Sequence, residues 1–309
     1  GPQQGDPLGP LEFCLTIHPL LKKLKSELRI GFLDDLTLGG YDTVVACDVD
    51  LIEVEAAALG LKLNKSKCEL VSNNYKSTSH LAFNGFRSIT NHEMCLLGAP
   101  IMPGDEVSKA LIEKTEELHR AVSRLSLLQT QDARTLLRFS LCIPKLMYIL
   151  RTSDCQSNPA LTDFDDTLRS GLSAIMNVEL NGDQWLQASL PVRDGGLGIR
   201  SAVMLAPSAF LASAAGTTEL QARILPPTIS VIPDESVKLS LECWTSRSQS
   251  NPPVGLMAHV QKNWDSACTL KSKEELLLRA NGQRDKARLL ASQAAHSADW
   301  LFALPISSI

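Results

Sequence analysis

Residues 28–40 have the sequence Leu-Arg-Ile-Gly-Phe-Leu-Asp-Asp-Leu-Thr-Leu-Gly-Gly, in which two short apolar runs flank the carboxylates Asp34 and Asp35. Apolar runs on either side of a short turn predict a β-hairpin. Hairpin turns usually contain Gly or Asn, which tolerate positive φ, whereas two adjacent carboxylates repel each other unless a cation neutralises them. Mg²⁺ binds through one or two carboxylates together with substrate phosphates. For an isolated Asp-Asp pair, a solvated acidic turn is the alternative.

The sequence on both sides of this hairpin has helical periodicity. Before it, apolar residues at helical spacing predict a helix over 7–28, with Pro7 in the first turn and a kink at Pro19. After it, apolar residues three and four apart predict a helix over 43–59, which ends at Gly60.

The rest of the chain is predicted to contain short strands followed by a long helical region. The strand-like pieces are 68–71, 81–83 and 94–97. Apolar spacing then predicts helices over 105–128, 130–151 with a kink at Pro144, 163–177, 199–215, 234–247, 255–267 and 272–297. The predicted fold class is therefore α+β and predominantly helical, with a small antiparallel sheet near the N-terminus.

Charge is unevenly distributed along the chain. The 309 residues carry a formal net charge of −4, which argues against bulk attraction to nucleic acid. Residues 107–151 nevertheless hold 8 basic and only 4 acidic side chains. Arg120 and Arg124 are four residues apart, as are Arg134 and Arg138, so each pair shares a helical face that can meet phosphates. An ordinary solvated helix face is the alternative.

Cysteine spacing and hydropathy argue against several classes of protein. No two of the 8 cysteines are close enough to form a CxxC or zinc-finger motif. Without a secretory leader, free thiols are expected. No apolar run reaches the roughly 18 residues that a membrane-spanning helix needs. We therefore expect an intracellular protein of the nucleus or cytoplasm, neither secreted nor membrane-spanning.

Four blocks of the sequence resemble, in the same order, blocks of the reverse transcriptases of non-LTR retroelements. They are the Gln-Gly block GPQQGDPLGPLEF (1–13), the Phe-x-Asp-Asp hairpin (32–35), the block GLKLNKSKC (60–68) with Asn64 and Lys67, and the Leu-Gly hairpin CLLGA (95–99). This resemblance covers roughly the first half of the chain. The stretches PVRDGGLGI (191–199) and DWLFALP (299–305) are similar to less specific segments that follow the polymerase core in such proteins.

The resemblance implies a division into a partial polymerase palm at 1–104, a helical thumb at 105–155 and a helical C-terminal extension at 156–309. It implies an RNA-directed DNA polymerase, in which two Mg²⁺ ions assist transfer of a deoxynucleotide to a primer 3′-hydroxyl. An RNA template, a DNA primer and deoxynucleotides would be its partners.

The resemblance also assigns roles to individual residues. Asp34 and Asp35 would be catalytic and would bind the metal, and Lys67 would be a catalytic residue near the departing pyrophosphate. The nucleotide and the template would contact Gln4, Gly5 and Phe32. The template–primer duplex would lie against the thumb residues Arg120, Arg124, Arg134 and Arg138.

Two departures from the family pattern suggest an alternative function. The family's other metal-binding carboxylate lies upstream of the Gln-Gly block, where this chain starts, so we expect residues 1–309 alone to be inactive as a polymerase. Glu12 occupies a position that is usually apolar, and it is predicted to face a buried stretch. The alternative is a decayed or repurposed fragment that acts as a non-catalytic helical module and binds nucleic acid or protein.

Two further motifs have structural interpretations. Asp163-Phe-Asp-Asp166 precedes an apolar helix and is predicted to supply its N-terminal cap and dipole charges. Gly195-Gly-Leu-Gly198 is predicted to be a loop, because no strand leads into it as a dinucleotide-binding motif requires.

Overall fold

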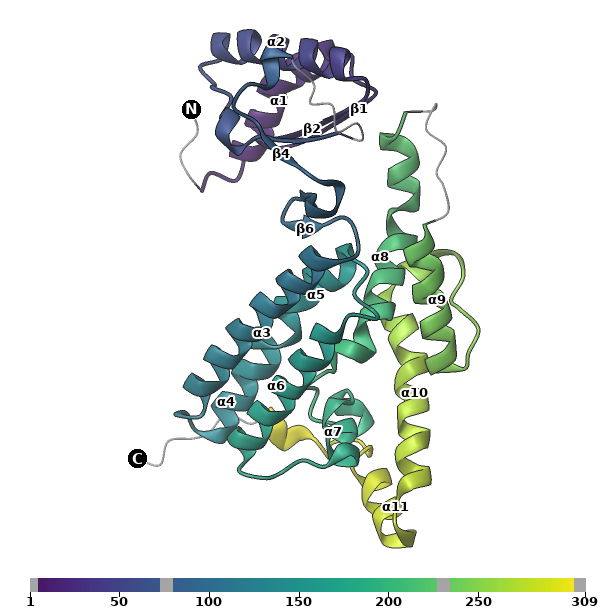
Figure 1. Cartoon of the computed structure of the whole chain (residues 1–309). Coiled ribbons are helices and arrows are strands. Elements are labelled where there is room, and N and C mark those ends of the chain that lie inside the picture. The colour runs from purple at the N-terminus through teal and green to yellow at the C-terminus, as the bar shows by residue number, and fades with distance from the viewer. Residues whose placement is uncertain (1–4, 73–79, 227–233, 303–309) are drawn as a thin grey trace. The chain divides into compact units, whose positions relative to one another are not determined.

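The computed structural model describes residues 5–72, 80–226 and 234–302 (Figure 1). This part of the chain is predominantly helical and contains three two-stranded sheets, so the predicted helical α+β class is confirmed at that level. The chain divides into two compact units. The first holds the residues up to Leu97 with a short segment that begins at Glu219, and the second holds most of the chain from Gly98 onward. Within the described ranges, no helix is long and apolar enough to cross a membrane.

The first unit alternates helices with short strands. Its elements are α1 (Gly9–Lys23), β1 (Leu28–Phe32), β2 (Asp35–Gly39), α2 (Asp42–Ala58), η1 (Lys65–Lys67), β3 (Glu69–Val71), η2 (Leu81–Phe83), β4 (Arg87–Ile89), η3 (Asn91–Glu93) and β5 (Cys95–Leu96). The strands β1 and β2 form the predicted antiparallel hairpin, and β3 pairs in parallel with β4.

Helix α2 organises the core of the first unit. Its buried residues include Ala46, Val49 and Ile52, at the spacing that predicted this helix. Ala46 and Val49 pack with Ala82 and Phe83, whereas Ile52 packs with Leu20 and Leu24, at and just beyond the end of α1. Two small apolar clusters on one helix thus hold this unit together.

Two predictions for the first unit are wrong. Residues 81–83 form the 3-10 turn η2 and not a strand, because Ala82 and Phe83 both turn inward to the α2 cluster. Glu12 is exposed and does not face a buried stretch, since α1 buries Leu20 near its C-terminal end.

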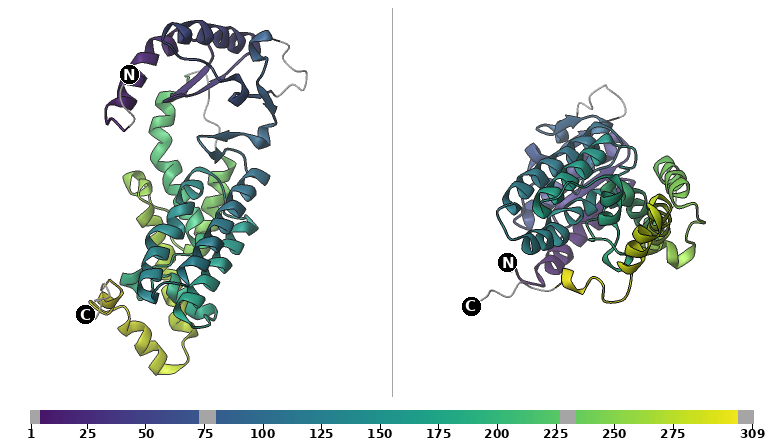
Figure 2. Two further views of the ribbon diagram at one scale, coloured as in Figure 1. Left: turned by 90° about the vertical axis from the view of Figure 1, so that its left-hand side faces the viewer. Right: turned by 90° about the horizontal axis from the view of Figure 1, so that it is seen from below.

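The second unit is helical. Its helices are α3 (Asp105–Leu125), α4 (Thr130–Leu136), a π-helical turn (Leu137–Leu141), α5 (Ile143–Thr152), α6 (Pro159–Met176), α7 (Gly182–Ser189), α8 (Ala202–Ile224), α9 (Glu235–Ser248), α10 (Gln261–Arg279) and α11 (Gly282–Ala291). The last residues of α8, from Glu219, are counted with the first unit. Shorter elements are β6 (Ala99–Pro100), η5 (Val192–Asp194), η6 (Gly255–His259) and η7 (Asp299–Leu301). Helix α3 packs along α6 (Figures 1 and 2), and one apolar core extends from Val107 to Ala209.

Several predicted helix bounds in the second unit are wrong. The predicted helix 130–151 is divided by the π-helical turn and by Cys142, and Pro144 lies in the first turn of α5 instead of kinking one long helix. Helix α7 was not predicted, although Asn181 and Gln184 form a capping box at its start. The predicted helices 255–267 and 272–297 are instead η6, α10 and α11, with a break near Ala280.

The acidic motif Asp163–Asp166 does not cap its own helix. Helix α6 begins earlier, at Pro159, where the Asn158 side chain accepts a hydrogen bond from the Ala160 amide. Asp165 is buried in the middle of α6 and accepts hydrogen bonds from the Ser201 hydroxyl and the Ala202 amide. It therefore satisfies the start of α8, a cap supplied from another helix.

Candidate functional site

The β1–β2 hairpin presents the Asp-Asp pair at its tip. Phe32 pairs with Asp35 as the last residues of the ladder, so Leu33 and Asp34 form a two-residue turn. Leu33 has φ of 54°, a left-handed conformation that costs a residue with a side chain roughly 1–2 kcal/mol. Backbone outliers of this kind cluster at functional sites.

The hairpin tip exposes its chemical groups to solvent. Asp34 and Asp35 are exposed, and the side chain of Phe32 is 57% exposed. Neither carboxylate makes a hydrogen bond or an ion pair within the described part of the chain. Two charged groups without partners are thus free to bind a cation or a ligand.

The carboxylate oxygens at this tip could supply some, but not all, of the ligands that a hard divalent cation needs. Mg²⁺ takes oxygen ligands and commonly binds one or two carboxylates plus phosphate oxygens, which Asp34 and Asp35 could supply from the protein side. Among the described residues, however, no group of three or more His, Cys, Asp or Glu side chains gathers at any point. The residues present therefore fit one side of a metal site, and not a complete protein cage for two ions.

The buried carboxylate of Asp48, which the sequence pattern did not predict to have a role, supports this hairpin. Asp48 of α2 is only 3% exposed and accepts hydrogen bonds from the Lys25 amide at 2.9 Å, the Ser26 amide at 2.7 Å and the Ser26 hydroxyl at 2.6 Å. These donors lie just before β1, and Arg29 of β1 donates to the Leu24 carbonyl. Asp48 therefore fixes the chain where it enters the hairpin.

The pKa of Asp48 shows how well this carboxylate is satisfied. Burial by itself would raise the pKa, but the hydrogen bonds from Ser26 and Lys25 and the nearby Arg29 lower it below its ordinary value. The sequence signal for this role is an Asp inside the apolar series Ala46, Val49 and Ile52.

The remaining residues predicted around the hairpin are less informative. Lys67 is exposed in η1 of the same unit. Gly5 has φ of 94°, and a Cβ there would meet no atom within 4 Å. Gln4 lies outside the described residues. Leu97 and Gly98, both at positive φ, form the turn that joins β5 to β6.

A basic groove lies between α3 and the region around α5 in the second unit. It has a volume of about 210 Å³ and is lined by Lys114, Glu117, Leu118, Arg120, Ala121, Arg124, Leu141 and Lys145. Four cations and one carboxylate thus surround one hollow. Glu117 pairs with Lys114 at 2.7 Å, and this partner lowers the pKa of Glu117. Arg124 and Lys145 are exposed and make no ion pair within the described ranges.

Arg120 and Arg124 therefore lie where the sequence placed them, on an exposed basic face, and the groove adds two lysines. Arg120 makes only a 3.9 Å exposed contact with Glu116, an ion pair that is worth little in water. The sequence did not predict that α5 packs beside α3, which is the contact that brings Lys145 to the groove.

Arg134 and Arg138 are not part of this exposed face. Arg134 is 1% exposed and donates a hydrogen bond to the Leu301 carbonyl. The guanidinium of Arg138 lies 4.6 Å from the ring centroid of Phe139 and 5.2 Å from that of Phe302. Both arginines are turned toward residues near the C-terminal end, because α4 and the π-helical turn bury Ala133 and Leu137 in the core.

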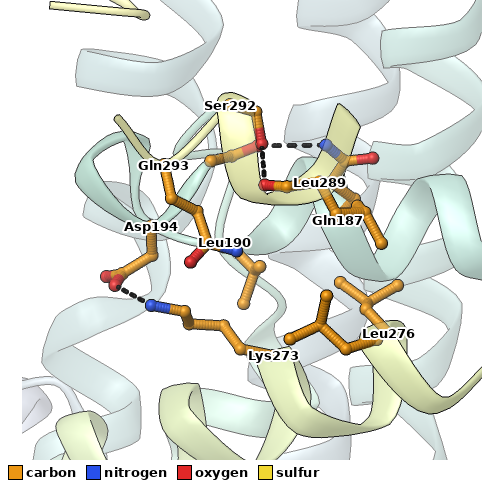
Figure 3. A pocket seen from close by; sticks show the side chains of 10 residues that line it. Gln187, Leu190, Asp194, Lys273, Leu276, Leu289, Ser292 and Gln293 are labelled. Carbon is orange, nitrogen blue, oxygen red and sulfur yellow. Dashed lines mark hydrogen bonds and ion pairs between the residues drawn. The ribbon is translucent and has the colours of Figure 1, made fainter. Parts of the chain in front are cut away.

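The Gly195–Gly198 segment is a loop, as predicted, and it forms a packed contact instead of a ligand site. A Cβ on Gly196 would lie 2.1 Å from the Leu190 carbonyl, so only glycine fits. Figure 3 shows the hollow beside this loop, where Lys273 and Asp194 form an ion pair at 3.1 Å. The Ser292 hydroxyl there donates to the Leu289 carbonyl. These polar groups satisfy one another and fix the loop against α10 and α11.

No protein-family model matches this chain, and no curated protein matches it. The functional interpretation of the hairpin tip and the basic groove therefore depends on the residues and geometry described above.

Proposed function

We propose that this chain is part of an RNA-directed DNA polymerase of the non-LTR retroelement type. The observation that carries the proposal is the hairpin tip, where Leu33 adopts a strained conformation next to two exposed carboxylates without protein partners. A two-residue hairpin turn requires positive φ at its first residue, where Gly or Asn is usual. Leucine at this position carries backbone strain, and strain of this kind clusters at functional sites.

In this proposal the chain's own residues bind and orient. The carboxylates of Asp34 and Asp35 hold the metal side of the site, and Mg²⁺, when bound, neutralises phosphate charge during nucleotidyl transfer. Phe32 contacts the nucleotide from the exposed end of β1. Lys67 offers a cation for the leaving pyrophosphate. The basic groove holds the phosphate backbone of the template–primer duplex.

We expect residues 1–309 alone not to polymerise, because the described residues supply only part of a two-metal site. Primer extension on an RNA template with Mg²⁺ tests this expectation. Extension above background that Asp34→Ala abolishes would show that the chain is a complete catalyst and that this expectation is wrong.

Metal binding by the hairpin tests the proposal itself. Mn²⁺ is a paramagnetic probe for Mg²⁺ sites, and its binding can be measured by electron paramagnetic resonance with the full chain. We expect one site that Asp34→Asn weakens at least tenfold and that Asp50→Asn, an exposed aspartate on α2, leaves unchanged. Equal Mn²⁺ binding by all three proteins would remove the support for a metal site at Asp34.

The basic groove also favours a second candidate function, a non-catalytic helical module that binds nucleic acid. This candidate needs the groove but not the hairpin. It predicts that the chain binds an RNA–DNA hybrid equally well with and without Mg²⁺, and that Asp34→Asn has no effect. Hybrid binding that Mg²⁺ strengthens in the wild type but not in Asp34→Asn would favour the polymerase proposal.

A further inference from the structure

Arg134 is a large charged side chain that the second unit buries almost completely. It lies on α4 between the core residues Ala133 and Leu137, and it is 1% exposed. Burying a guanidinium is costly unless hydrogen bonds and a counter-charge compensate it. The partners of Arg134 therefore decide whether this residue is structural or belongs to a site.

The partners of this guanidinium are incomplete. One terminal nitrogen of Arg134 donates to the Leu301 carbonyl. Its Nε and Nη1 atoms are buried without a hydrogen-bond partner in the described chain, and so is Nη1 of Arg138. Neither arginine is ion-paired to a carboxylate among the described residues, and burial lowers the pKa of both. Among the described residues, these two neighbouring cations thus have spare donors and no carboxylate paired with them.

A short segment of the chain covers these two arginines. We define the strap as residues 299–302, which consist of the single turn η7 and Phe302. The Gln131 side chain donates to the carbonyls of Trp300 at 3.3 Å and Leu301 at 2.9 Å. Leu301 is buried at 3% exposure, whereas Trp300 and Phe302 are 59% and 54% exposed. The strap is therefore held by one buried side chain, a few carbonyl contacts and the Phe302 ring over Arg138.

We propose that Arg134 and Arg138 form a latent phosphate site that the strap covers. This proposal rests on the proposed nucleic-acid-binding function of the second unit. Guanidinium groups match phosphate oxygens with paired, charge-assisted hydrogen bonds. When the strap moves aside, a phosphate takes the place of the Leu301 carbonyl, engages the spare donors of Arg134 and Arg138, and supplies the missing negative charge. The same chemistry serves a backbone phosphate and free inorganic phosphate.

Two variants loosen the strap in different ways and test the proposal. Leu301→Ser removes its buried side chain, and Phe302→Ala removes the ring over Arg138. Leu290→Ser on α11, where Leu290 is 55% exposed, is the matched control. Binding of a labelled RNA–DNA hybrid is measured by fluorescence anisotropy from 50 to 200 mM NaCl, and circular dichroism melting confirms that each variant is folded.

Each phosphate recruited by a loosened strap steepens the salt dependence of binding by a slope of about 0.9. From 50 to 200 mM NaCl, each strap variant should therefore lose about 3.5-fold more affinity than the wild type for every extra phosphate that it contacts. Adding Arg134→Gln to either variant should restore the wild-type slope. Slopes of both strap variants equal to that of Leu290→Ser would overturn the latent site, even if wild-type binding through the groove is normal.

Inorganic phosphate provides a readout that does not depend on nucleic acid. At constant ionic strength, phosphate should raise the melting temperature of Phe302→Ala more than that of Phe302→Ala combined with Arg134→Gln. If the wild-type chain fails to bind the hybrid, the proposed function fails and this comparison alone decides the latent site. Equal melting shifts in the two variants would mean that water, and not phosphate, satisfies the buried donors, and would overturn the latent site.

Discussion

Replacement of Asp48 by Asn is the sharpest test of how the hairpin is held. The carboxylate accepts hydrogen bonds from Lys25 and Ser26 through both of its oxygens, at 2.6–3.0 Å. Asn keeps one acceptor, loses the charge and turns an NH₂ group toward at least one N–H donor. A hydrogen bond to a charged group contributes about 1.5–3 kcal/mol, and an unsatisfied buried donor adds a comparable penalty. We therefore expect Asp48→Asn to lower the free energy of unfolding by about 3 kcal/mol at pH 7.

The pH dependence of this effect has a defined sign. The pKa of Asp48 in the folded chain lies below its ordinary value of 3.8. Its stabilising contribution is therefore full above about pH 4 and is lost as the pH falls through the folded-state pKa. Urea unfolding at several pH values should show a constant difference from the wild type above pH 5 and a shrinking one below about pH 4. Asp50→Asn on the same helix is the control, since Asp50 is exposed. A difference between the two variants of less than about 0.5 kcal/mol at pH 7 would refute this account of Asp48.

Two further predictions concern the second unit. Burial raises the pKa of Asp165 to about 6, so the folded chain favours the protonated carboxyl. The stability gained from this protonated form is full below about pH 4 and is lost as the pH rises through 6. Between these pH values, urea unfolding should show the wild type losing roughly 3 kcal/mol relative to Asp165→Asn, and parallel curves would contradict the assignment. Gly196→Ala should destabilise by about 2–4 kcal/mol, because its Cβ would lie 2.1 Å from the Leu190 carbonyl. Gly216→Ala, whose Cβ meets nothing closer than 3.8 Å within α8, should stabilise by about 0.5–1 kcal/mol, and thermal melting that reverses this order would show the loop to be adaptable.

Local patterns predicted the elements whose determinants are close in sequence. The hairpin at 28–40 follows from two apolar runs and a short turn, and α2 follows from the spacing of Val49 and Ile52. The exposed basic face of Arg120 and Arg124 follows from their four-residue separation on α3. In each case, neighbours along the chain decide the outcome.

The features that the sequence did not predict depend on contacts between distant segments. Asp165 resembles a cap for its own helix, but the amide that it satisfies belongs to Ala202, which is 37 residues away. Arg134 has the spacing of a surface residue, but it is buried because a segment near Leu301 packs over it. Helical periodicity identifies which residues share a face, and it does not identify what covers that face. The positive φ of Leu33 is a different case, because the local two-residue turn requires it although leucine is not a residue typical of positive φ.

The basic groove is common to both functions proposed for this chain, so its affinity for nucleic acid is the most direct test. The measurement is the salt dependence of RNA–DNA hybrid binding by the wild type and by a double variant, Arg120→Gln with Arg124→Gln. If each arginine contacts one phosphate, the double variant should lose about 1.8 from the slope of log affinity against log salt concentration. A slope that the double variant leaves unchanged, or a wild-type chain that does not bind the hybrid at 50 mM salt, would show that the basic groove does not bind nucleic acid.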